Sequence, residues 1–339
     1  MDAHVVPVSQ RSGTSSLSPH PSSFARRSLL VTSAAFLMGM AGPAVAQQFP
    51  ERPLRIVTSQ AGGGNDVQAR TIALGLTQAL GQQVIVDNRP SGVIPGEIVA
   101  KAIPNGYTML LYNNALWTGP LMQKTPYDPV RDFAPVTTVT IGPNILVVNN
   151  ALPVKSVKDL IALARSKPGQ LNYASSGMGA SNHLAAELFN SMAGVDIVRI
   201  GYKGAGPGLN DVIAGQIQVM FPTAGAAVPL MKSGRIKALA VTGLERSPVA
   251  PELPTIAESG LPGYESLAVY GIFAPAGTPK PIISLLNGEI VRVLATPEVK
   301  DRFFRLGMET VGGSPEQLAA KVKSEMTRMA KVIQQAGIK

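Results

Sequence analysis

The residues best suited to binding a ligand form a glycine loop, Ala61-Gly62-Gly63-Gly64-Asn65-Asp66. Glycines let a backbone approach a ligand closely and direct free N–H groups at it. The loop precedes a segment with helical periodicity, and the positive end of a helix dipole favours a bound anion. No Gly-Lys-Ser/Thr follows these glycines, which argues against a nucleotide P-loop. The loop therefore predicts either an anion site or a tight turn that binds nothing.

Two elements must hold this loop in position. Residues 54–58 have the apolar, β-branched composition of a strand, and residues 67–80 carry apolar side chains on one helical face, with Gly81 as a stop signal. The chain continues to alternate strand and helix patterns, which is typical of parallel α/β layers. Further strands are expected at 84–87, 107–112, 145–148, 171–174, 196–200, 218–221 and 237–242, and further helices at 97–102, 157–166, 182–193, 209–214, 281–295 and 315–336.

Two more glycine-rich junctions repeat this strand-to-helix design. One is Ser175-Ser176-Gly177-Met178-Gly179-Ala180-Ser181, and the other is Tyr202-Lys203-Gly204-Ala205-Gly206-Pro207-Gly208. In open α/β sheets, ligands bind outside the carboxyl ends of the strands, where such junctions converge. Three backbone cradles with few charged side chains predict a cleft for a small carboxylate. A structural turn could explain any one of them taken singly.

The first 46 residues are predicted to be an export signal. Arg26-Arg27 precede a short apolar stretch, 29–45, which ends at the small-x-small site Ala44-Val45-Ala46. Because this stretch is short for a membrane span, an uncleaved anchor is the less favoured alternative. We therefore predict cleavage near Ala46 and a periplasmic mature protein. The paired arginines are compatible with both the general secretory and the twin-arginine routes.

Composition narrows the chemistry of the mature chain. The full chain has a formal net charge of +9, and loss of three basic residues and one acidic residue with the signal leaves +7. No Lys/Arg block or aromatic-interleaved basic stripe is present, so nucleic acid is not an expected partner, whereas anionic ligands are favoured. The chain has no cysteine, and His183 is its only histidine after residue 46. We therefore expect no thiol nucleophile, no metal site and no cofactor.

Several sequence blocks follow one another through the mature chain. The most characteristic are residues 172–184, Asn-Tyr-Ala-Ser-Ser-Gly-Met-Gly-Ala-Ser-Asn-His-Leu, and Tyr202-Lys203-Gly204. In this order they resemble the solute receptors of tripartite tricarboxylate transporters, also called Bug-type receptors. The supporting blocks are Ala61-Gly62-Gly63 with Asp66 and Ala69-Arg70, Pro104-Asn105-Gly106-Tyr107-Thr108, and residues 154–160, 254–265 and 274–279.

The resemblance implies an α/β fold of the type II periplasmic binding proteins. Two α/β lobes would be joined by two crossover strands, near 140–150 and 266–275, and would close on a ligand like a Venus flytrap. Lobe 1 would consist of residues 47–145 plus 271–339, and lobe 2 of residues 146–270, with the ligand cleft between them. The length agrees, because about 290 mature residues exceed the usual size of a single domain.

The resemblance also implies a function. The chain would be a periplasmic receptor, not an enzyme, that captures a di- or tricarboxylate, an acidic amino acid or an aromatic acid. It would act as a monomer and deliver this ligand to a two-component membrane permease, or alternatively serve a signalling system as a carboxylate sensor. The implied ligand-binding residues are Ser59, Gln60, Ala61, Gly62, Gly63, Asp66, Ser175, Ser176, Gly177, Ser181, Tyr202, Lys203, Gly204 and Thr223.

Two of these residues carry a more specific expectation. Asp66 lies in the first turn of its helix, where a carboxylate is favoured, and is expected to cap the helix and order the loop. Lys203 is expected either to pair with the charge of the ligand or to hold its turn.

The chain departs from the family pattern in two loops of lobe 1. The usual Pro-Phe-Pro before the first glycines is Thr58-Ser59-Gln60, and the expected Gly-Ala-Gly-Gly run is replaced by the shorter Ser91-Gly92-Val93-Ile94-Pro95. Polar Ser59 and Gln60 indicate a ligand with extra hydrogen-bonding groups or a reshaped pocket. Drift in a duplicated receptor is the alternative explanation.

Two classes of enzyme are alternatives to a receptor. A Ser-His hydrolase would use Ser176 or Ser181 with His183, but the Gly-x-Ser-x-Gly elbow is missing, and residues two apart on a helix do not face each other. A dinucleotide enzyme would need a glycine where Asn182 stands and an acidic residue at the end of the next strand, whereas Asp196 begins its strand. Both classes are therefore disfavoured.

Overall fold

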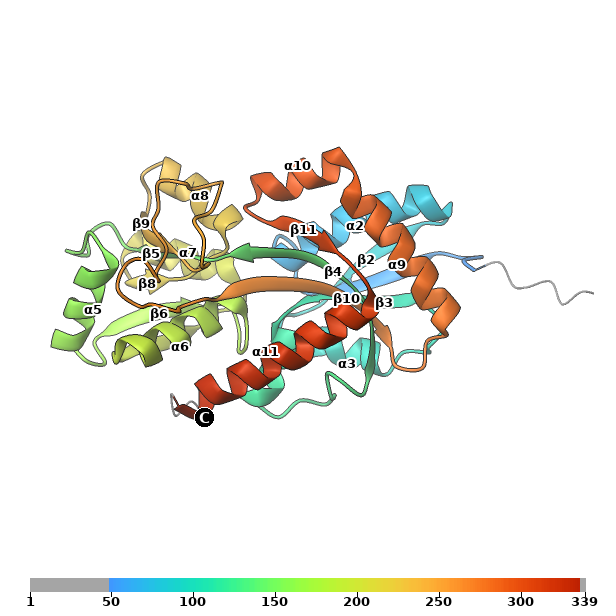
Figure 1. Ribbon diagram of the computed structural model, residues 1–339, viewed down its shortest axis with the longest axis horizontal. Coiled ribbons are helices and arrows are strands. Elements are labelled where there is room, and N and C mark those ends of the chain that lie inside the picture. The colour runs from blue at the N-terminus through green and yellow to red at the C-terminus, as the bar shows by residue number, and fades with distance from the viewer. Residues whose placement is uncertain (1–48, 336–339) are drawn as a thin grey trace, which may run out of the picture. The chain divides into compact units, whose positions relative to one another are not determined.

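The structure is a computed structural model that describes residues 49–335 (Figure 1). The predicted export signal and its cleavage site lie outside these residues. The described chain forms two α/β lobes, each built around its own β-sheet. This arrangement is the expected one for the type II periplasmic binding fold.

The first lobe is built on a six-stranded sheet with the order β11-β4-β10-β3-β1-β2. Strands β1, β2 and β3 are parallel to one another, whereas β10 runs antiparallel to both β3 and β4. The strands are β1 (Leu54–Thr58), β2 (Val84–Asn88), β3 (Thr108–Asn113), β4 (Phe133–Pro143), β10 (Leu267–Pro275) and β11 (Glu309–Gly312). The helices are α2 (Gly64–Leu80), α3 (Ile94–Ala100), α4 (Ala115–Thr118), α9 (Lys280–Ala295), α10 (Pro297–Arg305) and α11 (Pro315–Gln335).

The second lobe is built on a five-stranded sheet with the order β7-β6-β8-β5-β9. Strand β6 is parallel to β7 and β8, and β5 is antiparallel to β8 and β9. The strands are β5 (Ile145–Val148), β6 (Leu171–Ser175), β7 (Ile197–Gly201), β8 (Val219–Met220) and β9 (Lys237–Val241). The helices are α5 (Val157–Ser166), α6 (Ser181–Ala193), α7 (Ala205–Ala214) and α8 (Ala224–Lys232).

Both sheets are covered on two faces, which explains the almost continuous apolar strands. In β1, Ile56 packs into the cluster beneath α2 and α9, and its neighbour Val57 packs into the cluster on the opposite face. In β6, Tyr173 and Ala174 divide in the same way between the α5–α6 side and the α7–α8 side. Each parallel strand is followed in the chain by a helix, so the connecting loops lie at the same edge of each sheet.

The chain passes between the lobes at two buried points. A single residue, Asn144, separates β4 of the first sheet from β5 of the second. On the return, Tyr264 still packs in the core of the second lobe, and β10 of the first sheet begins at Leu267. The Thr242 hydroxyl joins the two points, because its Oγ1 accepts the Asn144 N–H at 2.7 Å and donates to the Ser266 carbonyl at 2.6 Å.

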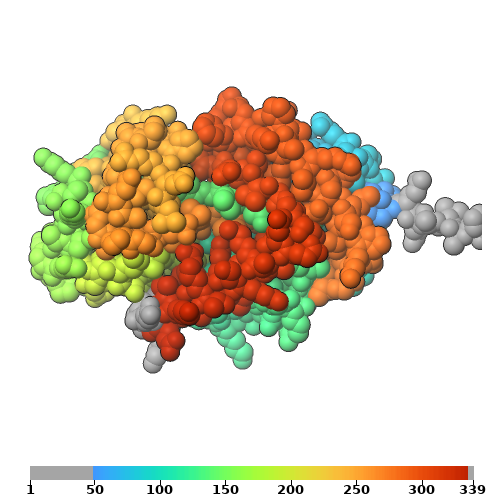
Figure 2. Space-filling view, viewed as in Figure 1, coloured from blue at the N-terminus to red at the C-terminus, as the bar shows by residue number. Residues whose placement is uncertain are grey.

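Helix α11 makes a third connection between the lobes. It packs on the first sheet through Leu318 and Val322, and near its end Met329 and Ile333 contact Leu184 of α6. Figure 2 shows α11 on the surface, reaching from the first lobe toward the second.

Candidate functional site

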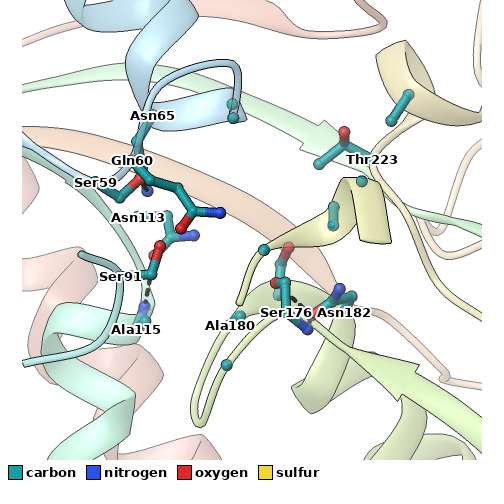
Figure 3. A pocket seen from close by; sticks show the side chains of 18 of the residues that line it. Ser59, Gln60, Asn65, Ser91, Asn113, Ala115, Ser176, Ala180, Asn182 and Thr223 are labelled. Atoms are coloured by element: carbon teal, nitrogen blue, oxygen red, sulfur yellow. Dashed lines mark hydrogen bonds between the residues drawn. The ribbon is translucent and has the colours of Figure 1, made fainter. Parts of the chain in front are cut away.

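A cavity of about 340 Å³ lies between the two lobes (Figure 3). Its walls are the loops that follow the carboxyl ends of strands in both sheets, together with Tyr270 of β10. Every side chain that lines it is uncharged. Recognition in this cavity must therefore come from backbone groups, helix ends and neutral polar side chains.

Four helices of nine or more residues begin at this cavity: α2 from the first lobe and α6, α7 and α8 from the second. None of their N-cap residues forms a side-chain cap hydrogen bond, so first-turn N–H groups lack this usual acceptor. Unsatisfied N–H groups and the helix dipoles favour a negatively charged group at this position. The four N-caps all line the cavity and are Gly63, Ala180, Gly204 and Thr223.

Asp66 orders the first glycine loop from behind. Its carboxylate accepts the Gly62 N–H at 2.9 Å and the Asn88 Nδ2 at 2.8 Å, and it pairs with Arg70 Nε at 3.0 Å. Burial pushes the pKa of Asp66 upward, but these hydrogen bonds and the Arg70 charge outweigh it and leave the pKa below its ordinary value. The Gly62 amide is thus already engaged, whereas the amides of Ala61 and Gly63 have no partner within residues 49–335.

Of the two polar residues before this loop, one bonds within the first lobe and the other contacts the second lobe. Ser59 is buried, and its Oγ accepts a hydrogen bond from Asn65 Nδ2 at 2.9 Å. Gln60 reaches across the cleft, where its Nε2 donates to the carbonyl of Lys203 in the second lobe. The two lobes are therefore in direct contact at the cavity.

The loop before α6 is also held in place by hydrogen bonds. Ser176 Oγ donates to Asn182 Oδ1 at 3.0 Å, and the Gly179 N–H donates to His183 Nδ1 at 3.0 Å. The Gly179 carbonyl accepts Thr118 Oγ1 of the first lobe at 2.9 Å. Gly179 has φ +72°, and a Cβ there would stand 2.7 Å from the Gly119 nitrogen, so only glycine fits this contact between the lobes.

His183 supports this loop and is not arranged as a catalytic base. It is only 1% exposed, and burial, with a smaller contribution from the Arg199 charge, lowers the pKa of His183 to about 3. The neutral ring uses Nδ1 for Gly179, and Nε2 lies 3.7 Å from Glu187 Oε1. Ser181 Oγ accepts from Asn144 Nδ2 at 3.3 Å, and within the described residues no hydrogen bond joins His183 to a serine.

The buried neutral state of His183 predicts a pH-dependent stability. Since its folded pKa lies below the ordinary value of 6.5, its contribution is complete above pH 6.5 and is lost as the pH falls toward 3. The slope is about 1.4 kcal/mol of unfolding free energy per pH unit. Urea unfolding between pH 7 and 4 should show wild type losing more stability than His183→Asn, whose amide oxygen can still accept the Gly179 N–H. Parallel losses in the two proteins would contradict the assignment.

Ten of the residues expected at the site line the cavity, and four do not. Ser175 is fully buried, and Asp66 faces the loop and Asn88. The Tyr202 hydroxyl donates to Asp211 Oδ2 at 2.6 Å, and burial followed by Asp211 raises the pKa of Tyr202 to about 12. Lys203 is exposed and contacts the cleft through its carbonyl. The ten lining residues are Ser59, Gln60, Ala61, Gly62, Gly63, Ser176, Gly177, Ser181, Gly204 and Thr223.

Other lining residues were not singled out from the sequence. Asn113 ends β3 at the same sheet edge as the first glycine loop, so the rule on the carboxyl ends of strands could have identified it. Ser91 belongs to the shortened loop that departs from the family pattern, and nothing in that pattern predicts a ligand contact for it. No sequence pattern predicts that Tyr270 lines the cavity, because its position depends on how β10 packs beside β3 and β4.

Two further features of the described residues concern metal binding and membrane insertion. Between residues 49 and 335, no three His, Asp or Glu side chains come together as metal ligands would. Over the same range, every helix is too short or too polar to cross a lipid bilayer.

The amino-acid sequence of this chain is similar to those of known proteins. Residues 68–338 match the family described as "Tripartite tricarboxylate transporter family receptor". Over 307 residues the chain is 36% identical to protein BugT of Bordetella pertussis (strain Tohama I), which covers 89% of this chain and 94% of BugT.

Two solved structures with bound acids are similar to most of this chain. R. palustris Rpa4515 with adipate has a TM-score of 0.82 and 39% sequence identity, covering 86% of this chain and 99% of that one. MatC from Rhodopseudomonas palustris with bound malate has a TM-score of 0.80 and 32% identity, covering 84% and 100%. The similarity therefore extends over most of the chain.

Proposed function

This chain belongs to the tripartite tricarboxylate transporter receptor family, and from that premise we propose that it captures a small organic carboxylate in the cavity between its lobes. The observation that carries the proposal is the meeting of four helix N-termini without side-chain caps at an uncharged cavity. Such a site favours an anion without requiring a basic side chain. The adipate and malate bound by two relatives are anions of this class.

In this proposal, backbone amides of both lobes hold one carboxylate of the ligand. Ala61 and Gly63 offer unengaged amides from the first lobe. The first turns of α6 and α7 offer amides from the second, together with the side chains of Ser181 and Thr223 at the cavity wall. Gly62 and Asp66 shape the loop, and Lys203 contributes its carbonyl to closure.

We further propose that ligand binding closes two lobes formed by residues 47–145 plus 271–339 and by residues 146–270. The hydrogen bonds from Gln60 to the Lys203 carbonyl and from Thr118 to the Gly179 carbonyl join these parts across the cavity. Hinge closure of this kind buries the ligand between domains.

Membership of this family supports a proposal for the wider setting. Export with cleavage near Ala46 would leave a periplasmic monomer that hands its ligand to a two-component permease. No chemical change of the ligand is proposed, because the one mature histidine is used inside the protein.

A thermal-shift screen of the exported protein tests the proposal directly. Succinate, malate, adipate, citrate, glutamate and benzoate are compared with their neutral amides and with a sugar. At least one acid should raise the melting temperature progressively as its concentration exceeds the dissociation constant, because binding to the native state alone stabilises it. The amide of the same acid should not. Stabilisation by the sugar with no response to any acid would exclude a carboxylate receptor.

A further inference from the structure

The first-lobe wall of the cavity carries a set of neutral polar side chains. Ser59, Gln60, Ser91 and Asn113 all line it, and Figure 3 shows them on the side opposite Ser176 and Asn182. The helix N-termini of α6, α7 and α8 belong to the facing lobe. The second lobe thus contributes three of the four helix N-termini, and the first lobe adds these neutral side-chain groups beside the N-terminus of α2.

Existing hydrogen bonds determine what two of these side chains still offer. The Lys203 carbonyl can only accept, so the Gln60 amide must turn its Nε2 toward it and keep Oε1 as a remaining acceptor. The Ala115 N–H can only donate, so Asn113 must turn its Oδ1 toward it, at 3.2 Å, and keep Nδ2 as a remaining donor. Within residues 49–335 no hydrogen bond engages either remaining atom.

Ser59 adds a second donor to this wall. Its Oγ already accepts from Asn65 Nδ2, and within the described chain its hydroxyl donates no hydrogen bond. The wall therefore presents both an acceptor, Gln60 Oε1, and donors, Asn113 Nδ2 and the Ser59 hydroxyl. A carboxylate oxygen could use the donors but would be repelled by Gln60 Oε1, whereas an alkyl chain would leave all of them unpaired.

We infer that this wall is a subsite for a hydroxyl group, and that the preferred ligand of this chain is a hydroxycarboxylic acid. The inference rests on the proposed function, since the acid group itself is held at the helix N-termini. A hydroxyl donates one hydrogen bond and accepts others, so it satisfies Gln60 Oε1 and Asn113 Nδ2 together. Gln60 then determines specificity as well as closure, because one amide serves both contacts.

Matched pairs of acids that differ by one hydroxyl test this inference. Dissociation constants are measured by calorimetry for succinate and malate, glutarate and 2-hydroxyglutarate, and benzoate and 3-hydroxybenzoate. In wild type, the hydroxylated member of the best-binding pair should bind about tenfold more tightly, as expected for two additional hydrogen bonds. In Gln60→Met and in Asn113→Leu, this ratio should fall to about twofold or less, whatever happens to the affinity for the plain acid.

Two controls separate specificity from folding. Gln83→Met makes the same chemical change at an exposed first-lobe residue outside the cavity, and it should keep the wild-type ratio. Thermal unfolding of every variant establishes whether it is folded. If Asn113→Leu does not fold, the ratio measured for Gln60→Met is sufficient to test the inference.

The outcomes distinguish this inference from the proposed function. If acids bind but no pair shows a preference for the hydroxyl, the subsite is refuted and the carboxylate receptor stands. A preference that survives unchanged in Gln60→Met also refutes the subsite. If no acid binds at all, the proposed function fails, and the subsite fails with it.

Discussion

Replacing Gly63 with leucine is expected to weaken the binding of every acid by at least about 100-fold, which corresponds to about 2.7 kcal/mol. Gly63 lines the cavity at the N-terminus of α2, and it has an ordinary φ of −88°. A Cβ at this position would meet only the Gln60 carbonyl, at 3.6 Å. The backbone therefore accepts a side chain without strain, and the leucine occupies space that the ligand needs.

The fold should tolerate this change. An N-cap glycine replaced by an apolar residue costs roughly 1 kcal/mol, which denaturant unfolding can measure. Gly288→Leu in α9 is the matched control, because a Cβ there meets nothing within 4 Å and the residue lies outside the cavity. Calorimetry with the best acid of the screen gives the affinities. Wild-type affinity in Gly63→Leu would mean that the ligand lies elsewhere.

Replacing Thr242 with valine is expected to lower the free energy of unfolding by about 2–4 kcal/mol, although the two side chains have nearly the same shape. Thr242 is fully buried at the crossing between the lobes. Its hydroxyl accepts the Asn144 N–H and donates to the Ser266 carbonyl. Valine leaves this buried donor and this buried acceptor without their partner, and neither can turn to water.

Thr327→Val provides the comparison for this prediction. Thr327 is exposed on α11, and its hydroxyl only donates to the Lys323 carbonyl one turn earlier. Its loss should change stability by less than about 0.5 kcal/mol. Urea unfolding of both variants decides the matter. A Thr242→Val protein as stable as wild type would show that the hydroxyl does not hold the crossover segments together.

The strand-to-helix junctions were predictable from local sequence. The loops at 61–66, 175–181 and 202–208 follow β1, β6 and β7, and each leads into a helix as expected. Apolar runs mark the strands, and glycines mark turns whose backbone other residues rarely adopt, as at Gly62 with φ +79°. These signals depend on neighbours in the chain, so they can be read before the fold is known.

Other elements had no such signal. Strand β4 contains several threonines that are buried, which periodicity alone does not distinguish from a polar loop. They are satisfied by distant groups: Thr140 Oγ1 donates to Gln68 Oε1 at 2.8 Å, and Thr137 Oγ1 to the Gly313 carbonyl at 2.9 Å. Helix α8 was also missed, because Pro229 stands inside it and proline normally ends a helical pattern.

The sequence by itself determined the α/β class, the family and the three glycine-rich loops at which ligand binding was expected. Only the tertiary structure decided which groups in those loops remain free. Asn88 and Arg70 orient Asp66, whose carboxylate accepts the Gly62 amide. His183 accepts the Gly179 amide. The Lys203 carbonyl accepts from Gln60 and so sets the orientation of its side-chain amide. The physical reason is that the sequence patterns of glycine turns and helices extend over only a few residues. A hydrogen-bonding group, in contrast, pairs with whichever partner the tertiary fold brings within about 3 Å of it.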